Sequence, residues 1–242
     1  MKFLIIIPTY NEAQNIQKLI PVIFAKLKGV SFSILVVDDS STDGTVDIVK
    51  GLNYENVHIL SRPSKQGLAT AYIQGMKYGI KEGFDAFIEF DADFSHDPEY
   101  LPLMTEYLSE HDVVIGSRNI KGGGVVGWSF LRNLISKGGS IYSRIVLNCP
   151  IKDLTGGFNG WKKEIIEKIN LDSIISKGYC FQIEMKYRAY QSKADIIEFP
   201  IIFKDRIYGE SKMDKSIFLE ALFNIIKLKI KMIKAGFNAR QN

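Results

Sequence analysis

The stretch Leu4-Ile5-Ile6-Ile7-Pro8-Thr9-Tyr10-Asn11-Glu12 shows a pattern of apolar and turn-forming residues that recurs along the first half of the chain. Its first four residues are apolar and mostly β-branched, which predicts a buried strand. The residues from Pro8 to Asn11 predict a turn and the cap of a helix that follows. This stretch therefore indicates one strand-turn-helix unit.

Four similar runs extend the pattern, and they are Ile34–Val37, Val57–Leu60, Ala86–Phe90 and Val113–Ile115. Stretches with helical character lie among them at 12–28, 43–51, 67–82 and 98–110, and their lengths are usual for globular helices. Strands that alternate with helices form mostly parallel sheets with right-handed crossovers. We therefore expect an α/β fold with a Rossmann-like, mostly parallel sheet.

The second half of the chain is less regular. Lys121–Gly124 predicts a mobile loop, and residues 153–160 are rich in glycine. Helices are expected at 128–147, 162–169 and 180–191, and a strand at 196–203. We find no internal repeat, so this half is expected to belong to the same domain as the first.

The composition is that of an ordinary globular protein, with 242 residues, 46% hydrophobic and 24% charged. The two cysteines, Cys149 and Cys180, form no CxxC motif and are typical of a reduced cytosolic protein. The apolar run near the N-terminus is too short for a signal peptide, and no run of 18 apolar residues predicts a membrane-spanning helix.

Basic residues gather in two segments that contain no acidic residue. Segment 113–152 holds six of the 31 Lys and Arg residues and segment 221–242 holds five, whereas all 27 Asp and Glu residues lie elsewhere. This asymmetry predicts contact with phosphates, an anionic lipid or nucleic acid. Nucleic acid is the least favoured partner. The basic residues lack interleaved aromatic platforms, and the predicted mostly parallel sheet differs from the sheets of the usual nucleic-acid recognition folds.

Two acidic residues end the fourth predicted strand. Asp91 and Asp93 are two positions apart, so in an extended chain their carboxylates would point the same way. Such a pair can bind one divalent ion and the diphosphate that it carries, because Mg²⁺ favours one or two carboxylates plus phosphate oxygens. A DxD pair also occurs by chance in many loops. His96 follows, and a single histidine is more often a structural hydrogen-bonding residue than part of a site.

A second acidic pair, Asp38 and Asp39, ends the second predicted strand in Val36-Val37-Asp38-Asp39-Ser40-Ser41-Thr42-Asp43-Gly44-Thr45. An acidic side chain here can accept a hydrogen bond from a ribose hydroxyl or a base amino group. Ser41 to Asp43 are also preferred helix caps, and both roles can hold in one loop. Neither a glycine-rich dinucleotide fingerprint nor a P-loop is present.

These motifs together resemble the GT-A glycosyltransferases of family 2. The resemblance begins with Ile6–Glu12, Val36–Ser41 and Phe90–His96, and it runs in order from about residue 3 to residue 213. Five later fragments narrow it to the dolichol-phosphate mannose synthase group, and they are Gly116-Ser117-Arg118, Gly122–Val125 with Gly127-Trp128 and Arg132, Asp153–Phe158, Gly178-Tyr179 with Phe181-Gln182 and Glu184, and Asp205-Arg206 with Gly209–Lys212. Asn159 and Cys180 depart from the pattern, and no QxxRW motif of processive synthases is present.

The resemblance implies roles for the matching residues. Pro8, Tyr10, Glu12, Val37 and Asp39 would hold the nucleotide, with Asp38 as the other acidic candidate. Asp91, Ala92 and Asp93 would hold the diphosphate and a divalent metal, Mg²⁺ or Mn²⁺, with Ser95 beside the metal. Arg118, Arg132, Arg206 and Lys212 would face phosphates, and Asp93, Arg206 and Lys212 would serve catalysis.

The resemblance also divides the chain into parts. Residues 1–116 would form the nucleotide-sugar half and 117–213 the acceptor half of one GT-A domain, followed by a basic tail over 214–242. In the tail, one polar stripe of a helix is formed by Glu220, Asn224, Lys227, Lys231 and Lys234. A basic amphipathic helix of this kind lies on an anionic membrane, docks on a small membrane-anchoring subunit, or packs on its own domain.

The leading hypothesis is an inverting, metal-dependent transfer of one sugar from a nucleotide-sugar to a dolichyl or polyprenyl phosphate. The resemblance favours GDP-mannose, and an alternative donor is UDP-glucose or another hexose. A hypothesis of another class is a non-catalytic nucleotide-sugar-binding subunit that regulates a membrane partner. We expect a cytoplasmic protein, peripheral on the cytoplasmic face of a membrane, without nucleic acid as a partner.

Overall fold

The computed structural model describes residues 1–176, 178–205 and 223–232. In chain order the elements are β1 (Phe3–Thr9), α1 (Ala13–Lys26), β2 (Phe32–Asp38), α2 (Thr45–Gly51), β3 (Val57–Ser61), α3 (Leu68–Lys81), β4 (Ala86–Glu89), η1 (Pro98–Tyr100), α4 (Leu101–Glu110), β5 (Val113–Ser117), β6 (Gly124–Val126), α5 (Phe130–Leu147), β7 (Asn159–Lys162), α6 (Lys163–Ile169), η2 (Leu171–Ser173), α7 (Tyr179–Gln191), β8 (Ile196–Pro200) and β9 (Ile202–Lys204). A further helix covers 223–232.

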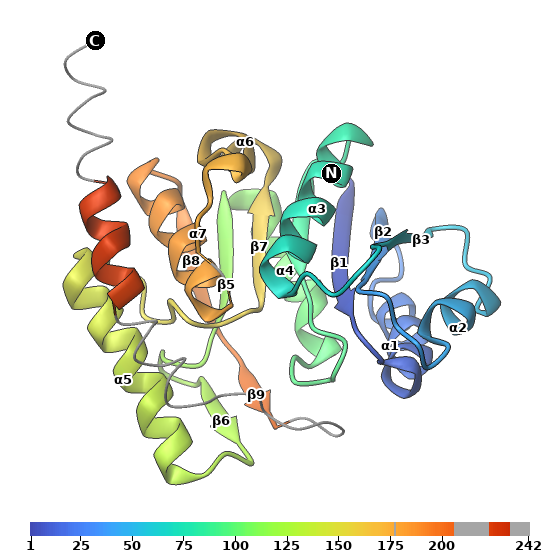
Figure 1. Ribbon diagram of the computed structural model, residues 1–242, viewed down its shortest axis with the longest axis horizontal. Helices are drawn as coiled ribbons and strands as arrows, with labels where there is room; N and C mark the ends of the chain where they lie inside the picture. Colours follow the sequence, from blue (N-terminus) through green and yellow to red (C-terminus); the bar gives the residue numbers. More distant parts are fainter. Residues whose placement is uncertain (177, 206–222, 233–242) are drawn as a thin grey trace.

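The centre of the molecule is a seven-stranded sheet in the order β3-β2-β1-β4-β7-β5-β8 (Figure 1). Strands β3, β2, β1 and β4 run parallel to one another, and β5 runs parallel to β8, while β7 is antiparallel to both of its neighbours. Strands β6 and β9 form a small separate sheet. The predicted α/β fold with a mostly parallel sheet is confirmed.

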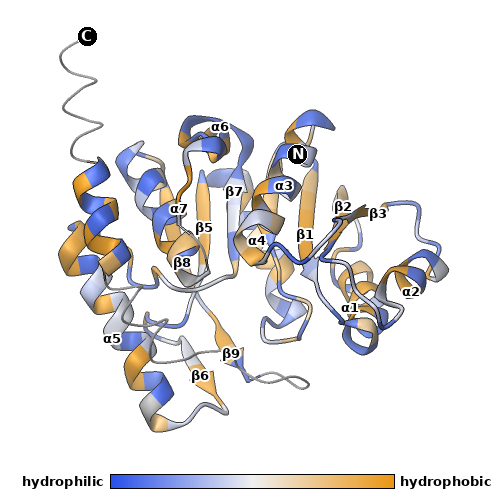
Figure 2. Cartoon of the chain, in the orientation of Figure 1, coloured by the Kyte–Doolittle hydropathy of each residue, from blue (hydrophilic) through white to orange (hydrophobic). Residues whose placement is uncertain are grey.

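Side chains alternate between the two faces of β1, as the period of a strand requires. Leu4 and Ile6 face a core shared with α3, α6 and α7, whereas Phe3, Ile5 and Ile7 face a second core shared with α1 and α4. All five of these side chains are buried, and Figure 2 shows β1 and β5 as largely hydrophobic. Burial on both faces explains why β1 reads as a continuous apolar run.

Helix α3 lies directly against the sheet because two of its residues have no side chain. A Cβ at Gly75 would come within 2.6 Å of Ile6, and a Cβ at Gly79 within 2.5 Å of Phe87. This close packing places Tyr72, one turn before Gly75, next to the carboxyl edge of β4.

Three details differ from the sequence-based expectations. The glycine-rich segment 153–160 ends in strand β7, where a Cβ at Gly160 would come within 2.4 Å of Leu108 in α4. The strand expected at 196–203 is divided at Ile201 into β8 and β9, which belong to different sheets. The loop expected at Lys121–Gly124 ends in strand β6, since Gly124 pairs with Ile202.

The helix over 223–232 lies beside α5 at one end of the molecule (Figure 1), where Lys229 Nζ donates a 3.0 Å hydrogen bond to the carbonyl of Leu147. The predicted tail helix is therefore partly within the described residues, whereas Glu220 and Lys234 lie outside them. Within the described part of the chain, no helix combines the length and the apolar character needed to cross a bilayer.

Candidate active site

The loops after β1 and β2 are joined to each other at the carboxyl edge of the sheet. Asp38 accepts hydrogen bonds from Thr9 Oγ1 at 2.8 Å and from Ser41 Oγ at 2.6 Å. Asn11 contacts the second loop twice, through its N–H to Ser41 Oγ and through its Oδ1 to the N–H of Thr42. The Asp38 carboxylate is thus buried and engaged in holding the two loops together.

Asp39 is held by a third loop, which follows β3. Its Oδ2 accepts from the N–H groups of Gln66 at 3.2 Å and Gly67 at 2.9 Å, and its carboxylate forms a buried ion pair with Arg62. Gly67 has φ of +92°, a conformation that favours glycine. The 62–67 loop was missed in the sequence analysis, although Gly67 directly precedes α3 and is a recognisable turn signal.

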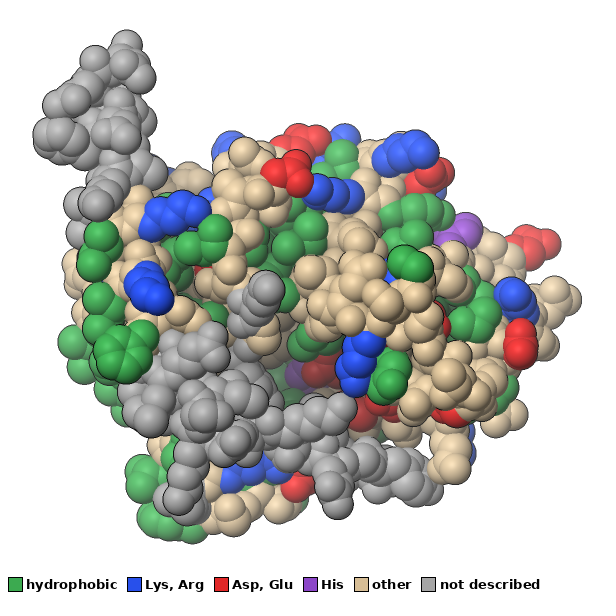
Figure 3. Space-filling model, viewed as in Figure 1, with side chains coloured by type: hydrophobic (Ala, Val, Ile, Leu, Met, Phe, Trp, Pro, Cys, Tyr) green, Lys and Arg blue, Asp and Glu red, His purple; other side chains and the backbone are tan. Residues whose placement is uncertain are grey.

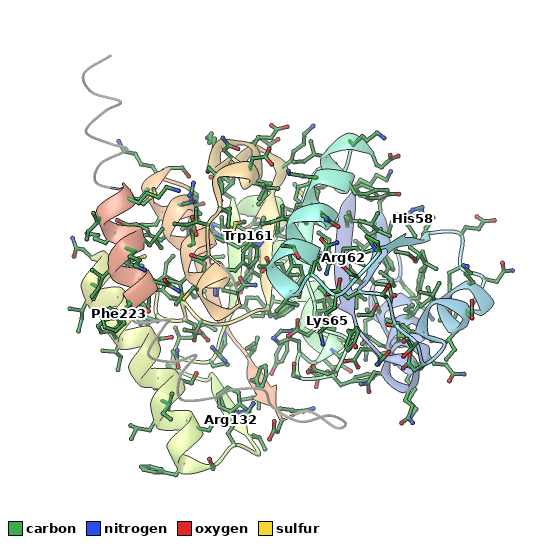
Figure 4. The ribbon with its side chains drawn as sticks, in the orientation of Figure 1. His58, Arg62, Lys65, Arg132, Trp161 and Phe223 are labelled. Carbon is green, nitrogen blue, oxygen red and sulfur yellow. The ribbon has the colours of Figure 1, made fainter. Side chains whose placement is uncertain are left out.

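The other residues expected to hold a nucleotide differ in what they offer. Tyr10 is 41% exposed, and Lys65 Nζ lies 3.5 Å from the centroid of its ring. Glu12 is half-buried and its Oε2 accepts from Asn15. Val37 is fully buried within β2, and Pro8 stands within β1. Figure 4 shows Arg62 and Lys65 on this side of the molecule.

The Asp91–Asp93 segment is not extended, which corrects the sequence-based reason for placing its two carboxylates together. Ala92 and Asp93 lie in a turn, and Phe94 follows with φ of +58°. Both carboxylates nevertheless act on the same neighbours, since each influences the pKa of Tyr72 and of His96. The pair therefore does occupy one site, brought together by the turn.

Ser95 and His96 complete this cluster from the loop after β4. Asp93 Oδ1 accepts from the Ser95 N–H at 3.0 Å, and His96 Nδ1 lies 4.0 Å from Asp91 Oδ2. Burial lowers the pKa of His96 below its usual value, although Asp91 and Asp93 oppose that effect, so the ring is neutral at pH 7. The buried atoms Ser95 Oγ and His96 Nδ1 have no hydrogen-bond partner among the described residues.

Arg118 lies in the second half of the site and is paired with a buried acid. Its Nε and Nη2 donate to the two oxygens of Asp153 at 2.8 and 2.7 Å, and Nη2 also donates to Thr155 Oγ1 at 2.9 Å. Burial alone would raise the pKa of Asp153, but Arg118 and Lys186 together lower it below its usual range. This geometry gives Arg118 a structural role, and its expected phosphate contact stays a prediction.

Arg132, the next expected phosphate ligand, extends from the start of α5 toward β6 and β9 (Figure 4). Its guanidinium lies 4.2 Å from the ring centroid of Trp128, and Nη1 donates to Asp205 at 3.1 Å. Its buried Nε has no hydrogen-bond partner among the described residues. Arg206 and Lys212 lie outside the described residues, so their expected roles stay predictions.

The two halves of the site meet at the 153–158 loop. A Cβ at Gly157 would lie 3.5 Å from His96 Cε1 and 3.8 Å from Asp91 Oδ2. The Phe158 ring stacks on His96 with 5.4 Å between centroids. A hollow with acidic side chains and a histidine at its bottom is visible in Figure 3. The arrangement offers carboxylates from the first half and basic residues from the second, which suits a substrate that carries a diphosphate.

Comparison with solved structures agrees with this reading of the fold. The chain superposes on glucosyl-3-phosphoglycerate synthase of Mycobacterium tuberculosis, solved with Mn²⁺, UDP-glucose and glycerol 3-phosphate, with a TM-score of 0.67 and 16% identity over 95% of this chain and 79% of that one. The form of that enzyme with Mg²⁺ and UDP gives 0.69 and 16% over 94% and 79%. The fold and its carboxylate edge define a protein of the GT-A class.

The family follows from sequence. The model of glycosyl transferase family 2 matches residues 4–170, and the chain belongs to this family. It is 40% identical to undecaprenyl-phosphate mannosyltransferase of Micrococcus luteus over 99% of both chains. It is also 39% identical to polyprenol monophosphomannose synthase of Mycolicibacterium smegmatis over 94% of this chain and 87% of the relative. The resemblance noted in the sequence motifs is confirmed.

Proposed function

We propose that this glycosyltransferase transfers one mannosyl residue, with inversion, from GDP-mannose to a polyprenyl phosphate such as dolichyl phosphate. The proposal rests on one observation: similarity to two relatives named as mannosyl-transferring enzymes extends over nearly the whole chain. The Asp91/Asp93 pair after β4 supports it. A non-catalytic nucleotide-sugar-binding subunit would have no need of this carboxylate pair.

The carboxylate pair suits a divalent metal ion. Asp91 and Asp93 supply two carboxylates. Ser95 Oγ and His96 Nδ1, which have no hydrogen-bond partner in the part of the chain that the structure describes, lie beside them. Among the described residues no three His, Cys, Asp or Glu side chains form a metal cage. Two carboxylates plus substrate phosphates are the ligands that Mg²⁺ prefers, so Asp91, Asp93 and Ser95 would hold Mg²⁺ or Mn²⁺. When bound, the ion would neutralise charge on the diphosphate leaving group.

The acceptor needs little activation by the protein. A phosphate monoester has a second pKa near 6 and is mostly dianionic at pH 7, which makes it a ready nucleophile. The chain's contribution is therefore to orient the two substrates and to offset their charge. Arg132, Arg206 and Lys212 would bind the acceptor phosphate or the transferring sugar, and the nucleotide would lie on Pro8, Tyr10, Glu12, Val37 and Asp39, with Asp38 fixing the loops beneath it.

A polyprenyl phosphate is anchored in a bilayer, so the protein would work on a membrane surface. Four apolar residues of α5 are more than half exposed, and they are Phe130, Leu134, Ile141 and Ile145. Phe223, Ile226 and Ile230 of the neighbouring helix are also exposed, and the same helix carries Lys227 and Lys231. Hydrophobic side chains gather at this edge in Figure 3. Such a surface fits peripheral binding on the cytoplasmic face of a membrane or on a small anchoring subunit.

The deciding experiment is transfer from radiolabelled nucleotide-sugars to a polyprenyl phosphate in detergent micelles. GDP-mannose, UDP-glucose and UDP-galactose are compared with Mg²⁺, with Mn²⁺ and with EDTA. We expect lipid-linked mannose with GDP-mannose and either metal, and none with EDTA. Transfer from UDP-glucose instead would make UDP-glucose, and not GDP-mannose, the donor. Binding of a nucleotide-sugar without transfer to any acceptor would favour the non-catalytic regulatory subunit.

A further inference from the structure

A buried lysine holds the loop that joins the two halves of the site. Lys186 lies in α7, is fully buried, and donates hydrogen bonds from Nζ to the carbonyls of Asp153 at 2.8 Å and Gly156 at 2.7 Å. These carbonyls stand near the start and in the middle of the 153–158 loop. We call Lys186 and the two carbonyls the Lys186 clamp.

The clamp is part of a buried row of alternating acidic and basic side chains. Asp153 and, where it is ionised, Glu89 favour the charged form of the Lys186 ammonium, and Asp153 is paired in turn with Arg118. Burial lowers the pKa of Lys186 to about 8, and the two carboxylates oppose that effect. A buried charge is costly unless it is compensated, and here the hydrogen bonds to the two carbonyls and the attraction of Asp153 offset that cost.

Glu89 and its neighbours close the row beneath the site. Asn159 Nδ2 donates to Glu89 Oε2 at 2.7 Å and to Gln182 Oε1 at 2.8 Å, which links strands β4 and β7 to helix α7. Glu89 is the last residue of β4 and precedes Asp91 by two positions. The row therefore spans from the strand that carries the carboxylate pair to the loop that faces it.

The clamped loop forms one wall of the site. Asp153 Oδ1 accepts from the Gly156 N–H at 2.9 Å, which folds the loop on itself. Gly157, directly after the clamped carbonyl of Gly156, packs against His96 and Asp91, and Phe158 stacks on His96. The position of Gly157 thus depends on a carbonyl that accepts its shorter hydrogen bond from Lys186, at 2.7 Å, and a longer one from Asn159 Nδ2, at 3.2 Å.

We propose that Lys186 is a positioning residue for sugar transfer, which sets the 153–158 loop against Asp91 and, through Asp153, fixes the Arg118 guanidinium. This inference rests on the proposed function, because the turnover that it affects is that of the proposed transfer. Lys186 is fully buried, so it would touch neither substrate. Its removal leaves the Asp153 carbonyl without this donor and leaves the Gly156 carbonyl with only the longer 3.2 Å hydrogen bond from Asn159 Nδ2, which lets the loop move away from the carboxylate pair.

The test compares Lys186→Met with a matched variant on the same helix, Arg188→Met. Arg188 also donates to backbone carbonyls, those of Ile169 and Ser173, but these belong to a segment away from the carboxylate pair. For both variants kcat, the KM for GDP-mannose, the Kd for GDP and the thermal midpoint are measured. We expect Lys186→Met to lower kcat at least 10-fold with Kd for GDP changed less than 3-fold, and Arg188→Met to keep kcat within 3-fold.

A second readout does not depend on activity. Hydrogen exchange of the 153–158 amides, followed by mass spectrometry, should be at least 10-fold faster in Lys186→Met and unchanged in Arg188→Met. If the wild type transfers no mannose, this readout still tests the clamp while the proposed function has failed. Should Lys186→Met not fold, Lys186→Arg keeps the charge and the donors and should retain at least a third of wild-type kcat. Unchanged exchange in the loop, or equal losses of kcat in both variants, would overturn the proposal.

Discussion

The hydroxyl of Tyr72 donates a 2.9 Å hydrogen bond to Oδ1 of Asp91, which ties helix α3 to the carboxylate pair after β4. Tyr72 is fully buried, and burial together with the Asp91 charge raises its pKa well above the usual value. The hydroxyl therefore stays a donor throughout the neutral pH range. Asp91 is therefore oriented by helix α3 as well as by the turn that follows it.

Tyr72→Phe tests this orientation. The variant keeps the ring and loses the hydroxyl, so we expect a loss of roughly 1.5–3 kcal/mol of unfolding free energy, the range for a hydrogen bond to a charged group. Turnover should fall about 10-fold, because one carboxylate of the pair loses its fixed rotamer. Urea unfolding and steady-state transfer measure the two effects, and turnover equal to that of wild type would show that the turn alone orients Asp91.

Asp93→Asn tests the metal assignment. The amide removes a ligand charge, and we expect turnover to fall 100-fold or more, corresponding to several kcal/mol of lost leaving-group stabilisation. The matched control is Asp85→Asn at the opposite end of β4, where Asp85 accepts from the Lys2 N–H. The control should keep its turnover and its half-saturating Mn²⁺ concentration. Full metal-dependent transfer by Asp93→Asn would show that Asp93 is not a metal ligand.

Glu89→Gln tests the buried charge row through pH. Burial raises the pKa of Glu89 from 4.5 to about 7, so native Glu89 holds its proton where the unfolded chain has lost it. The resulting stability is complete below about pH 4.5 and is lost as pH rises toward 7. Glu89→Gln lacks this titration, so the difference in unfolding free energy from wild type should change by on the order of 1–3 kcal/mol between pH 5 and 7.5. Urea unfolding at the two pH values measures it, and parallel pH profiles would contradict it.

Lys227→Glu combined with Lys231→Glu tests membrane contact. Each lysine contributes roughly 1 kcal/mol near an anionic surface, so reversing two should release the protein from vesicles of phosphatidylglycerol and phosphatidylcholine. The control reverses Lys163 and Lys168 of α6, which lies away from α5 (Figure 1). Transfer to a short, water-soluble polyprenyl phosphate should persist in both variants. Unchanged co-sedimentation would mean that the helix serves the fold or a protein partner.

Much of the fold could be predicted because its signals are local. The apolar runs ending at Ile7 and Val37 and the helices between them depend on side-chain periodicity alone, and the structure confirms them. Strand β7 was missed for a reason that is not local: Gly160 looks like part of a loop, yet its missing Cβ makes room for Leu108 of α4. Secondary-structure propensity describes a residue by itself, whereas packing depends on the neighbouring element that the residue contacts in the fold.

The site was predicted less completely than the fold. Motif spacing identified the carboxylate pair, but the partners of Asp39, of Asp91 and of Arg118 lie 19 or more positions away along the chain. Arg118 illustrates the difference. Its position in an acid-free segment predicted a phosphate ligand, whereas the structure pairs it with Asp153, an acid just beyond the end of that segment. Sequence proximity says little about which charge a folded chain brings nearest.

Strand β7 has a mechanical consequence. It is hydrogen-bonded to β4 on one side and to β5 on the other, so the halves that would carry the donor and the acceptor share one unbroken backbone ladder. A hinge between them would require several of these hydrogen bonds to break together. Clamshell closure of the kind seen in two-lobed binding proteins is thereby ruled out for this sheet. Entry of substrates and release of products must instead be controlled by the loops along the sheet's edge. These loops can move while the hydrogen bonds of the ladder stay intact.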